Sequence, residues 1–206
     1  MNYLAHLYLS GNDKETIVGN FIGDYVKGKS YTKYPLKIQK GILMHRQIDS
    51  FTDNHPKFRE AKKLLNDEYG LYSGIIIDFF YDHFLARNWD IYSKRTLRDF
   101  AKKTHAVLLS HFFHLPVKVQ RFLPFLIQNR RLESYANIDG IQQSLEIMSR
   151  YTSLPEKSQI AIEILKLNFE FLHENFSVFM LELIEFVEGG FEIEINRPNV
   201  ITGSQY

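Results

Sequence analysis

The sequence contains no cysteine and has few residues that break regular structure, with 6 prolines and 11 glycines among 206 residues. Without cysteine there is no disulfide, no thiolate nucleophile and no zinc or iron–sulfur site with cysteine ligands. Any metal ion would therefore be bound by histidine and carboxylate side chains. The hydrophobic content of 45% is enough to build a sizeable core and predicts one domain over residues 1–206.

Signals for a membrane or for secretion are also missing. The longest apolar runs fall far short of the roughly 18 residues that a membrane span requires. The first residues, MNYLAHLYLSGND, include no basic region and no cleavage site of small residues. We therefore expect a cytoplasmic protein that has no contact with a membrane.

Motifs of several common protein classes are absent as well. There is no G-x-S-x-G for a serine nucleophile and no P-loop or G-x-G-x-x-G for a nucleotide. The RRM, KH, zinc-finger and helix-turn-helix signatures are missing, and the net charge is only +1. Nucleic acid is accordingly not expected as a partner.

The small net charge hides an uneven distribution. From Glu156 onward there are three basic residues against nine glutamates, so residues 1–155 carry the positive excess. Between Tyr25 and Arg46 the basic residues occur without any acid, and they are Lys27, Lys29, Lys33, Lys37, Lys40 and Arg46. Such a run is either a solvated surface or a docking site for an acidic protein or a phosphate-bearing ligand.

Hydrophobic residues recur with the period of an α-helix along most of the chain. We expect helices at Asp13–Lys27, Pro35–Ser50, Pro56–Tyr69, Ser73–Arg87, Leu97–Phe113, Val117–Gln128, Gly140–Tyr151 and Glu156–Glu188. Only FEIEIN, at 191–196, alternates with a period of two. The prediction is an all-α bundle of about seven to eight helices, with a terminal strand or extended tail at residues 191–206.

Local signals set several of the expected helix ends. Asn12 or Asp13 precedes the first helix as a cap, and Gly28 follows it. Asp53 stands in a turn before the helix that begins at Pro56, where it is a candidate cap. Gly189 and Gly190 are expected to end the last and longest helix.

Polar pairs interrupt three of these helices at a spacing of four residues, which places both members on one helix face. The pairs are Asn20 with Asp24, His45 with Asp49, and Asp78 with Asp82. Asp82 and the adjacent His83 lie within the apolar segment IIIDFFYDHFLARNW at 75–89, where a carboxylate needs a partner because burying its charge is costly.

Structural interpretations of single residues remain open. Asp49 could pair with Arg46, Asp53 could act only as a cap, and His6 could be a core histidine. Taken together, however, His and Asp on three helices indicate a site for a hard divalent metal ion. Such an ion polarises a phosphoryl oxygen and generates hydroxide at neutral pH, which is the chemistry of phosphoester hydrolysis.

Four ordered motifs resemble the acyl carrier protein phosphodiesterase family. They are MNYLAHL at the start, GNFIGDYVKG at 19–28, GILMHRQIDSFTD at 41–53 and DFFYDHFLARNW at 78–89, and YANIDGIQQSLEIMSRY at 135–151 resembles the family's C-terminal block. The family is related to the HD-type metal-dependent phosphohydrolases, which implies an HD-like bundle. The usual adjacent His-Asp is absent, and the nearest equivalents are the reversed Asp82-His83 and the spaced His45 and Asp49.

The resemblance implies hydrolysis of the phosphodiester that joins 4'-phosphopantetheine to a serine of holo-acyl carrier protein. It also implies a divalent metal cofactor, Mn²⁺ first, with Mg²⁺ or Fe²⁺ as alternatives. We assign Asp24, His45, Asp82 and His83 to the metal or its immediate surroundings. The catalytic set is His6, Arg46, Asp49 and Asp78, in which Asp49 and Asp78 are further ligands or groups that orient the ligands, and His6 is a general acid or an additional ligand. Arg46 would clamp the phosphate.

The substrate's charge would give the basic run a purpose, because acyl carrier proteins are acidic. Lys27, Lys29, Lys33, Lys37, Lys40 and Arg46 are the expected substrate-binding residues. Two other functions remain open. The chain could be a metallohydrolase of nucleotides or another small phosphodiester, or a non-catalytic binding module with a structural metal ion.

Overall fold

The computed structural model describes residues 2–195, and the regular structure within this range is helical throughout. The helices of the N-terminal half are α1 (Tyr3–Leu9), α2 (Lys14–Ile22), η1 (Gly23–Tyr25), η2 (Gly28–Lys33), α3 (Leu36–Asn54), α4 (Pro56–Lys63), α5 (Asn66–Tyr69), η3 (Gly70–Tyr72) and α6 (Ser73–Arg87). Those of the C-terminal half are α7 (Trp89–Tyr92), α8 (Leu97–Ser110), η4 (Phe112–His114), α9 (Val117–Gln128), α10 (Arg131–Ser134), α11 (Ile138–Tyr151), α12 (Ser158–Leu167) and α13 (Phe169–Phe191). Every helix described between residues 2 and 195 is too short or too polar to span a lipid bilayer.

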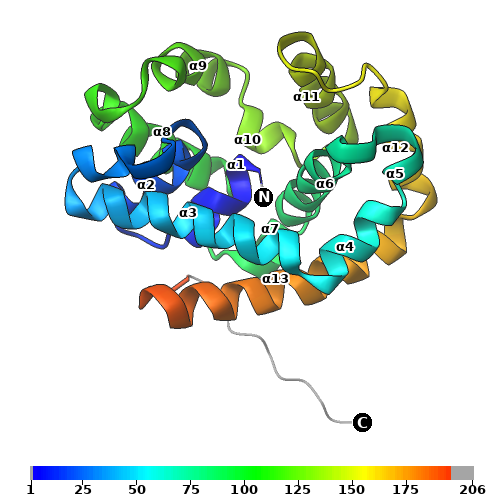
Figure 1. The fold of residues 1–206 in the computed structure, drawn as a ribbon, viewed down its shortest axis with the longest axis horizontal. Helices are drawn as coiled ribbons and strands as arrows, with labels where there is room; N and C mark the ends of the chain where they lie inside the picture. Colours follow the sequence, from blue (N-terminus) through cyan, green and yellow to red (C-terminus); the bar gives the residue numbers. More distant parts are fainter. Residues whose placement is uncertain (1, 196–206) are drawn as a thin grey trace.

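Helix α1 lies at the centre of the molecule, with α3 and the long α13 below it and α9 and α11 above it (Figure 1). Six of its seven residues are buried, from Leu4 to Leu9. The side chain of Asn2 accepts a hydrogen bond from the N–H of Tyr3 and caps the helix. A helix this short is marginal by itself, so its position depends on the helices packed around it.

Helices α2 and α3 cross at two glycines that leave no layer of side chains between them. A Cβ atom on Gly19 would overlap the carbonyl oxygen of Ile38, and one on Gly41 would overlap that of Thr16. Farther along the same contact, a Cβ atom on Gly23 would overlap the ring of His45. Because the backbones touch, side chains at the end of α2 and in the middle of α3 are brought to one place.

The all-α class is confirmed, and the expected helix Ser73–Arg87 occurs with those bounds. The count of seven to eight helices was wrong, since thirteen α-helices occur between residues 2 and 195. Several expected helices are divided by short breaks. The first one ends at Ile22, because the chain tightens into a 3₁₀ turn where Gly23 meets His45, and Asp24 therefore lies on η1.

The C-terminal helix also differs from its prediction. Asn168 interrupts it, and its side chain donates to the carbonyl oxygen of Ile164, which ends α12 before α13 begins. Helix α13 then passes through the two glycines to Phe191, whose carbonyl oxygen accepts a hydrogen bond from Lys40. The helix ends instead at Glu192, which adopts the left-handed conformation with a φ of 52°.

The expected extended tail begins one residue later than predicted. Phe191 is helical, and residues 192–195 form no strand. Ile195 is buried and its N–H donates to the carboxylate of Glu188. This part of the tail is therefore laid on the surface, whereas residues 196–206 lie outside the described part of the chain.

Candidate metal centre

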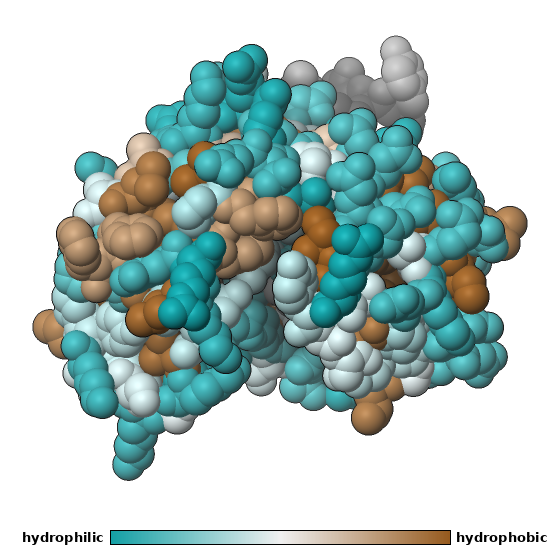
Figure 2. All heavy atoms as spheres, turned by 90° about the horizontal axis from the view of Figure 1, so that it is seen from above, coloured by the Kyte–Doolittle hydropathy of each residue, from teal (hydrophilic) through white to brown (hydrophobic). Residues whose placement is uncertain are grey.

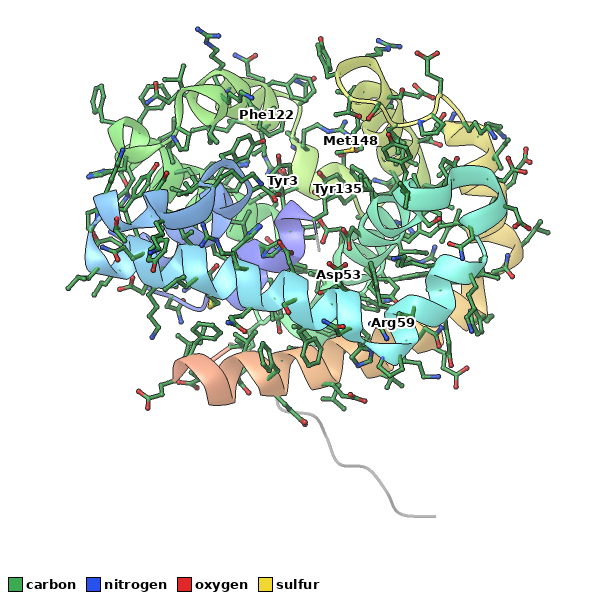
Figure 3. The ribbon with its side chains drawn as sticks, viewed as in Figure 1. Tyr3, Asp53, Arg59, Phe122, Tyr135 and Met148 are labelled. Atoms are coloured by element: carbon green, nitrogen blue, oxygen red, sulfur yellow. The ribbon has the colours of Figure 1, made fainter. Side chains whose placement is uncertain are left out.

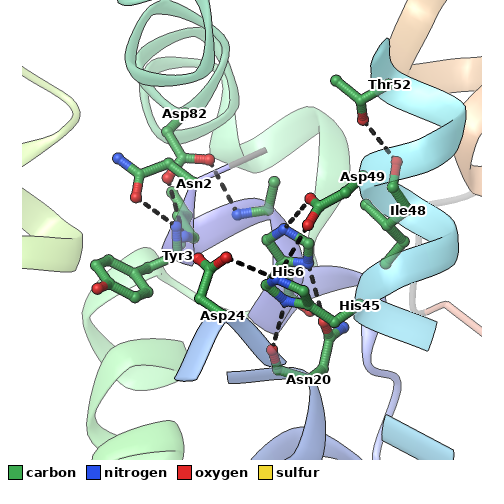
Figure 4. A network of polar contacts seen from close by, with 12 residues as sticks. Asn2, Tyr3, His6, Asn20, Asp24, His45, Ile48, Asp49, Thr52 and Asp82 are labelled. Carbon is green, nitrogen blue, oxygen red and sulfur yellow. Dashed lines mark hydrogen bonds and ion pairs between the residues drawn. The ribbon is translucent and has the colours of Figure 1, made fainter. Parts of the chain in front are cut away.

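The side chain of His6 projects from α1 toward α2, where Asn20 fixes its orientation (Figure 4). The amide nitrogen of Asn20 donates to the carbonyl oxygen of His6 at 2.7 Å and to the hydroxyl of Ser10 at 2.9 Å. Its amide oxygen, 2.9 Å from Nδ1 of His6, must then accept, so that Nδ1 carries the proton. The other ring nitrogen, Nε2, is left with its lone pair.

His45 repeats this arrangement from α3. Its Nδ1 atom donates to the backbone carbonyl oxygen of Asn20 at 2.8 Å, and its ring stacks on that of His6 with centroids 4.0 Å apart. Both histidines are almost fully buried, with 3% and 4% of their surfaces exposed. One residue, Asn20, thus holds two parallel imidazoles with their Nε2 atoms on the same side.

Asp49, one turn after His45 on α3, faces both of these nitrogen atoms. Its Oδ1 lies 3.2 Å from Nε2 of His6, and its Oδ2 lies 3.1 Å from Nε2 of His45. These are ion-pair distances, but neither Nε2 atom has the geometry of a hydrogen bond within residues 2–195. Asp24 on η1 completes the surroundings, with its Oδ1 3.5 Å from Nε2 of His45.

The charges of the cluster control how it holds protons. Burial lowers the pKa of His6 to about 4, with the neighbouring His45 acting in the same direction. Burial also lowers the pKa of His45, but Asp24 and Asp49 outweigh it and raise that pKa to about 9. Burial opposes the ionisation of Asp49, yet the two histidines hold its pKa well below the usual range. The cluster therefore attracts a positive charge between its carboxylates and imidazoles.

These features fit a divalent metal ion. His6, His45 and Asp49 can each present one ligand atom, and these atoms lie within 4.8 Å of one another. Ligands of a small divalent ion sit about 2.0–2.2 Å from it, which puts neighbouring ligand atoms roughly 3 Å apart. Histidines that ligate metals commonly donate their other N–H to an oxygen, as both do here to Asn20.

Asp82 does not belong to this cluster. Its carboxylate is fully buried and accepts hydrogen bonds from the N–H groups of Leu4 at 2.9 Å and Ala5 at 3.0 Å. These are first-turn donors of α1, which otherwise lack an intrahelical partner. Burial nevertheless raises the pKa of Asp82 to about 7. Asp82 therefore anchors the helix that carries His6.

His83 likewise lies apart from the cluster. It is fully buried, and its Nδ1 atom lies 2.8 Å from the carbonyl oxygen of Tyr135, to which it donates. Burial lowers the pKa of its ring, which favours the neutral form. The sequence placed Asp82 and His83 with the metal, but the structure brings neither into the group formed by His6, His45 and Asp49.

A cavity of about 340 Å³ opens beside the cluster. Four carboxylates line it, namely Asp24, Asp49, Asp53 and Asp78. Seen from the side of α9 and α11, the surface is hollowed near its centre (Figure 2), and Met148 and Asp53 lie on opposite sides of the opening (Figure 3). Burial raises the pKa of Asp78 to about 6, so its carboxyl group can hold a proton near neutrality.

Arg46 is engaged away from the cluster. Its guanidinium donates to the carbonyl oxygens of Val26 and Gly28 at 2.7 and 2.8 Å and lies over the ring of Tyr31. It thus holds the segment that contains the first lysines of the basic run. The suggested pairing of Arg46 with Asp49 is wrong, since Asp49 faces the two histidines.

Five lysines of the basic run, Lys27, Lys29, Lys33, Lys37 and Lys40, are exposed. Lys37 pairs with Asp13 at 2.8 Å, and Lys40 donates to the carbonyl oxygen of Phe191.

The N-terminal cap of α4, which the sequence assigned to Asp53, is supplied by His55, whose Nδ1 accepts a hydrogen bond from the N–H of Lys57. Asp53 is free of that task because α3 continues through Asn54.

Comparison with known proteins places this arrangement in a family. The family model described as acyl carrier protein phosphodiesterase matches residues 1–183. The chain belongs to the acyl carrier protein phosphodiesterase family. That match includes the helices that carry His6, His45 and Asp49, together with the complete lining of the cavity.

Three relatives, each named acyl carrier protein phosphodiesterase, show how similar the chain is to other members of the family. The protein of Yersinia pestis is 37% identical over 150 residues, which cover 72% of this chain and 78% of the relative. The protein of Yersinia enterocolitica is 35% identical with the same coverage. That of Photorhabdus laumondii is 33% identical over 151 residues, covering 73% and 76%. No solved structure matches the chain, so the HD-like arrangement is not confirmed.

Two residues of the phosphodiesterase site carry more of its geometry than the sequence indicated. Asn20 was paired only with Asp24, whereas it orients both histidines. Gly23 was not singled out, although a side chain there would displace His45. The motif GNFIGD contains both residues, but single-chain spacing cannot tell a glycine that permits a close contact from one that ends a helix.

Proposed function

We propose that the protein is a metal-dependent phosphodiesterase that hydrolyses the link between 4'-phosphopantetheine and a serine of holo-acyl carrier protein, giving apo-acyl carrier protein. The observation that carries the proposal is the His6, His45 and Asp49 cluster at the edge of an open cavity. Membership of the family supplies the substrate.

In this proposal His6, His45 and Asp49 hold the divalent cation, with Asp24 beside them. Imidazole combined with carboxylate suits Mn²⁺ first, and Mg²⁺ or Fe²⁺ remain alternatives. When bound, the cation supplies Lewis-acid polarisation of a phosphoryl oxygen and lowers the pKa of a water molecule. It also offsets the carboxylates of the cavity, which would otherwise repel an anionic phosphodiester.

The surrounding residues orient this site and move a proton. Asn20 accepts the Nδ1 protons of both histidines, which directs their Nε2 atoms to the cation. Nε2 of His6 already has its lone pair, whereas His45, whose pKa is raised to about 9, would release its Nε2 proton when the cation binds. Asp78, whose pKa is raised by burial to about 6, is the proposed proton donor to the departing serine oxygen. His6, with a pKa of about 4, serves better as a ligand than as an acid.

The contacts of Arg46 and the lysines suggest how an acidic partner is received. Arg46 organises the segment with Lys27 and Lys29, and these lysines with Lys33 provide the exposed positive charge. Lys37 and Lys40 have structural contacts and contribute less. The absence of cysteine agrees with a reducing cytoplasm, where we place the reaction.

The partial exposure of the carboxylates argues against a purely structural ion. The side chain of Asp24 is 63% exposed and that of Asp49 is 38% exposed, and both line the cavity. A structural metal site is usually closed, whereas a catalytic site keeps an open position for water or substrate. The geometry therefore favours catalysis over a non-catalytic binding module.

The test is incubation of holo-acyl carrier protein with the purified protein and Mn²⁺, followed by mass spectrometry of the carrier protein. Loss of the phosphopantetheine mass and recovery of the serine hydroxyl are expected, with no conversion when EDTA is in excess. Intact holo-protein after long incubation with Mn²⁺, Mg²⁺ and Fe²⁺ would refute the function. Conversion of a nucleotide diester under the same conditions would then point to a small-molecule phosphodiesterase.

A further inference from the structure

The cavity beside the cluster has an apolar wall that metal binding does not explain. Ile75 and Phe79 of α6 form one part of it, and Met148 of α11 forms another. Ile75 is 37% exposed although it is large and hydrophobic. The cation would contact carboxylates and imidazoles, and the phosphate would contact the cation, so this apolar wall faces another part of the substrate.

The apolar wall extends from the cluster along the axis of α6. Asp82 is bonded to the start of α1, the helix that carries His6, and Ile75 is seven residues earlier than Asp82 on α6. With a rise of about 1.5 Å per residue, Ile75 is roughly 10 Å farther along the helix axis. On α3 the step from Asp49 to Asp53 runs along the cavity in the same manner, by about 6 Å.

We propose that Ile75, Phe79 and Met148 bind the pantetheine arm of the substrate while its phosphate lies at the cluster. The proposal rests on the proposed function and names the part of the substrate that this wall takes. The arm fits in size, because about 340 Å³ lies near the lower end of the roughly 300–1,000 Å³ of small-molecule sites. A helix of a carrier protein, about 10–12 Å across, is too wide for such a space.

The chemistry of the arm matches the two kinds of surface in the cavity. Pantetheine carries a dimethyl-substituted carbon close to the phosphate, followed by methylene groups, and these apolar parts gain from contact with Ile75, Phe79 and Met148. It also carries two amide N–H groups and a hydroxyl, which are donors. Asp53 lines the same cavity and offers carboxylate oxygens as acceptors.

The experiment fills the cavity at its two more accessible wall positions, with Ile75→Trp and Met148→Trp. Either substitution should raise KM for holo-acyl carrier protein about tenfold or more, since a pocket that loses its fit for an apolar group discriminates on this scale. Hydrolysis of methyl 4-nitrophenyl phosphate, whose methyl group is too small to reach the wall, should change less than about threefold. Leu167→Trp, at an 85% exposed position on α12, is the matched control and should change neither.

A second measurement uses the wild-type protein and does not depend on the folding of a variant. Pantetheine itself should inhibit the hydrolysis of holo-acyl carrier protein competitively, and Met148→Trp should weaken that inhibition. If wild type converts holo-acyl carrier protein but millimolar pantetheine does not inhibit, the arm is bound elsewhere and this inference is wrong. Equal losses on both substrates in Ile75→Trp would also overturn it, because the wall would then support the cluster. Failure of wild type to convert any carrier protein refutes the proposed function instead.

Discussion

Two groups of histidine and aspartate in this molecule look alike in sequence and differ in what surrounds them. His6, His45 and Asp49 point their Nε2 and carboxylate atoms at one another beside an open cavity. Asp82 and His83, in contrast, are fully buried and bonded to backbone groups of Leu4, Ala5 and Tyr135. The first group has ligand atoms to offer an ion, while the second uses its polar atoms to hold other helices in place.

The comparison shows that burial alone does not identify a functional carboxylate. A buried aspartate requires compensation, and backbone N–H groups at a helix start supply it as well as a metal ion does. Asp82 satisfies that requirement structurally, although it lies in a largely apolar helix. Exposure to a cavity, which only the folded structure reveals, separates the two cases.

The largest effect on activity is expected when a histidine of the first group is removed, and the matching substitution in the second group serves as its control. His45→Ala should lower holo-acyl carrier protein hydrolysis by about a hundredfold or more, beyond the roughly 10–100-fold typical of residues that only support a metal ligand. It should remain folded and bind Mn²⁺ weakly by calorimetry. His83→Ala is the matched control. It should lower the melting temperature, since it removes a buried side chain, but retain the specific activity of its folded fraction. The reverse pattern would exchange the roles of the two groups.

A smaller but still large effect is expected from Gly23→Ala. The added Cβ atom meets the ring of His45, so the ring must shift relative to His6 and Asp49. Affinity for Mn²⁺ and activity at limiting Mn²⁺ should fall by about tenfold, with partial recovery at excess metal. Gly189→Ala, where nothing lies within 4 Å of the new atom, is the control. Unchanged Mn²⁺ affinity in Gly23→Ala would show that His45 does not ligate the ion.

Substitution of Asp82 should reduce the stability of the fold more than it reduces the activity. Asp82→Ala leaves the N–H groups of Leu4 and Ala5 without their acceptor, which costs about 1–3 kcal/mol for each buried group. Urea denaturation should detect this loss. Activity should fall only to the extent that the loosened α1 displaces His6 from the cluster. Complete loss of Mn²⁺ binding in a folded Asp82→Ala protein would make Asp82 a ligand after all.

The pH dependence of stability offers a finer test of the same residue. Burial raises the folded pKa of Asp82 to about 7, while an unfolded aspartate titrates near about 3.9. The folded protein therefore binds this proton more tightly than the unfolded chain does. The stabilisation that protonated Asp82 contributes is complete below about pH 4 and is lost as the pH rises through about 7. Asp82→Asn should flatten this part of the curve of melting temperature against pH, measured without metal. An unaltered curve would mean that Asp82 is already ionised at low pH.

The smallest effect is expected from the surface charges. Changing Lys27, Lys29 and Lys33 together to glutamate should raise KM for holo-acyl carrier protein several-fold at low salt, because exposed charges act mainly through the long-range field. The difference from wild type should shrink as salt increases. The control is a second triple variant in which the exposed Lys94, Lys102 and Lys118 are changed to glutamate, so that the net charge changes by the same amount. Equal effects of both triple variants would assign the basic run to general solvation.

Much of the fold followed from the sequence because apolar periodicity records which face of each helix is buried. The helix Ser73–Arg87 was predicted correctly, and Asp13 is the cap among the two residues, Asn12 and Asp13, that the sequence offered. The breaks were less visible. Asn168 divides the last helix through one side-chain hydrogen bond, and α1 is anchored in part by Asp82, 78 residues away from Leu4. Long-range contacts of this kind leave no local pattern.

The candidate site was predicted in part for the same reason. The spacing of His45 and Asp49 puts both on one face of α3, and this pair lies at the centre of the cluster. His6 joins them through the central position of α1, which periodicity did not reveal. Asp82 and His83 have equally suitable residue types and spacing, but in the folded structure they contact the backbone of Leu4 and Tyr135.

The glycine crossing of α2 and α3 has a consequence for motion. Where side chains interdigitate, helices can slide by changing rotamers, but the backbones at Gly19 and Gly41 touch and leave nothing to rearrange. The two helices should then behave as one cooperative unit, with amide protons at the crossing exchanging only when the whole unit opens. The face of α3 that carries His45 and Asp49 would therefore stay in place during turnover. Any movement that lets a long substrate enter the cavity would have to occur on its other side, where α11 carries Met148.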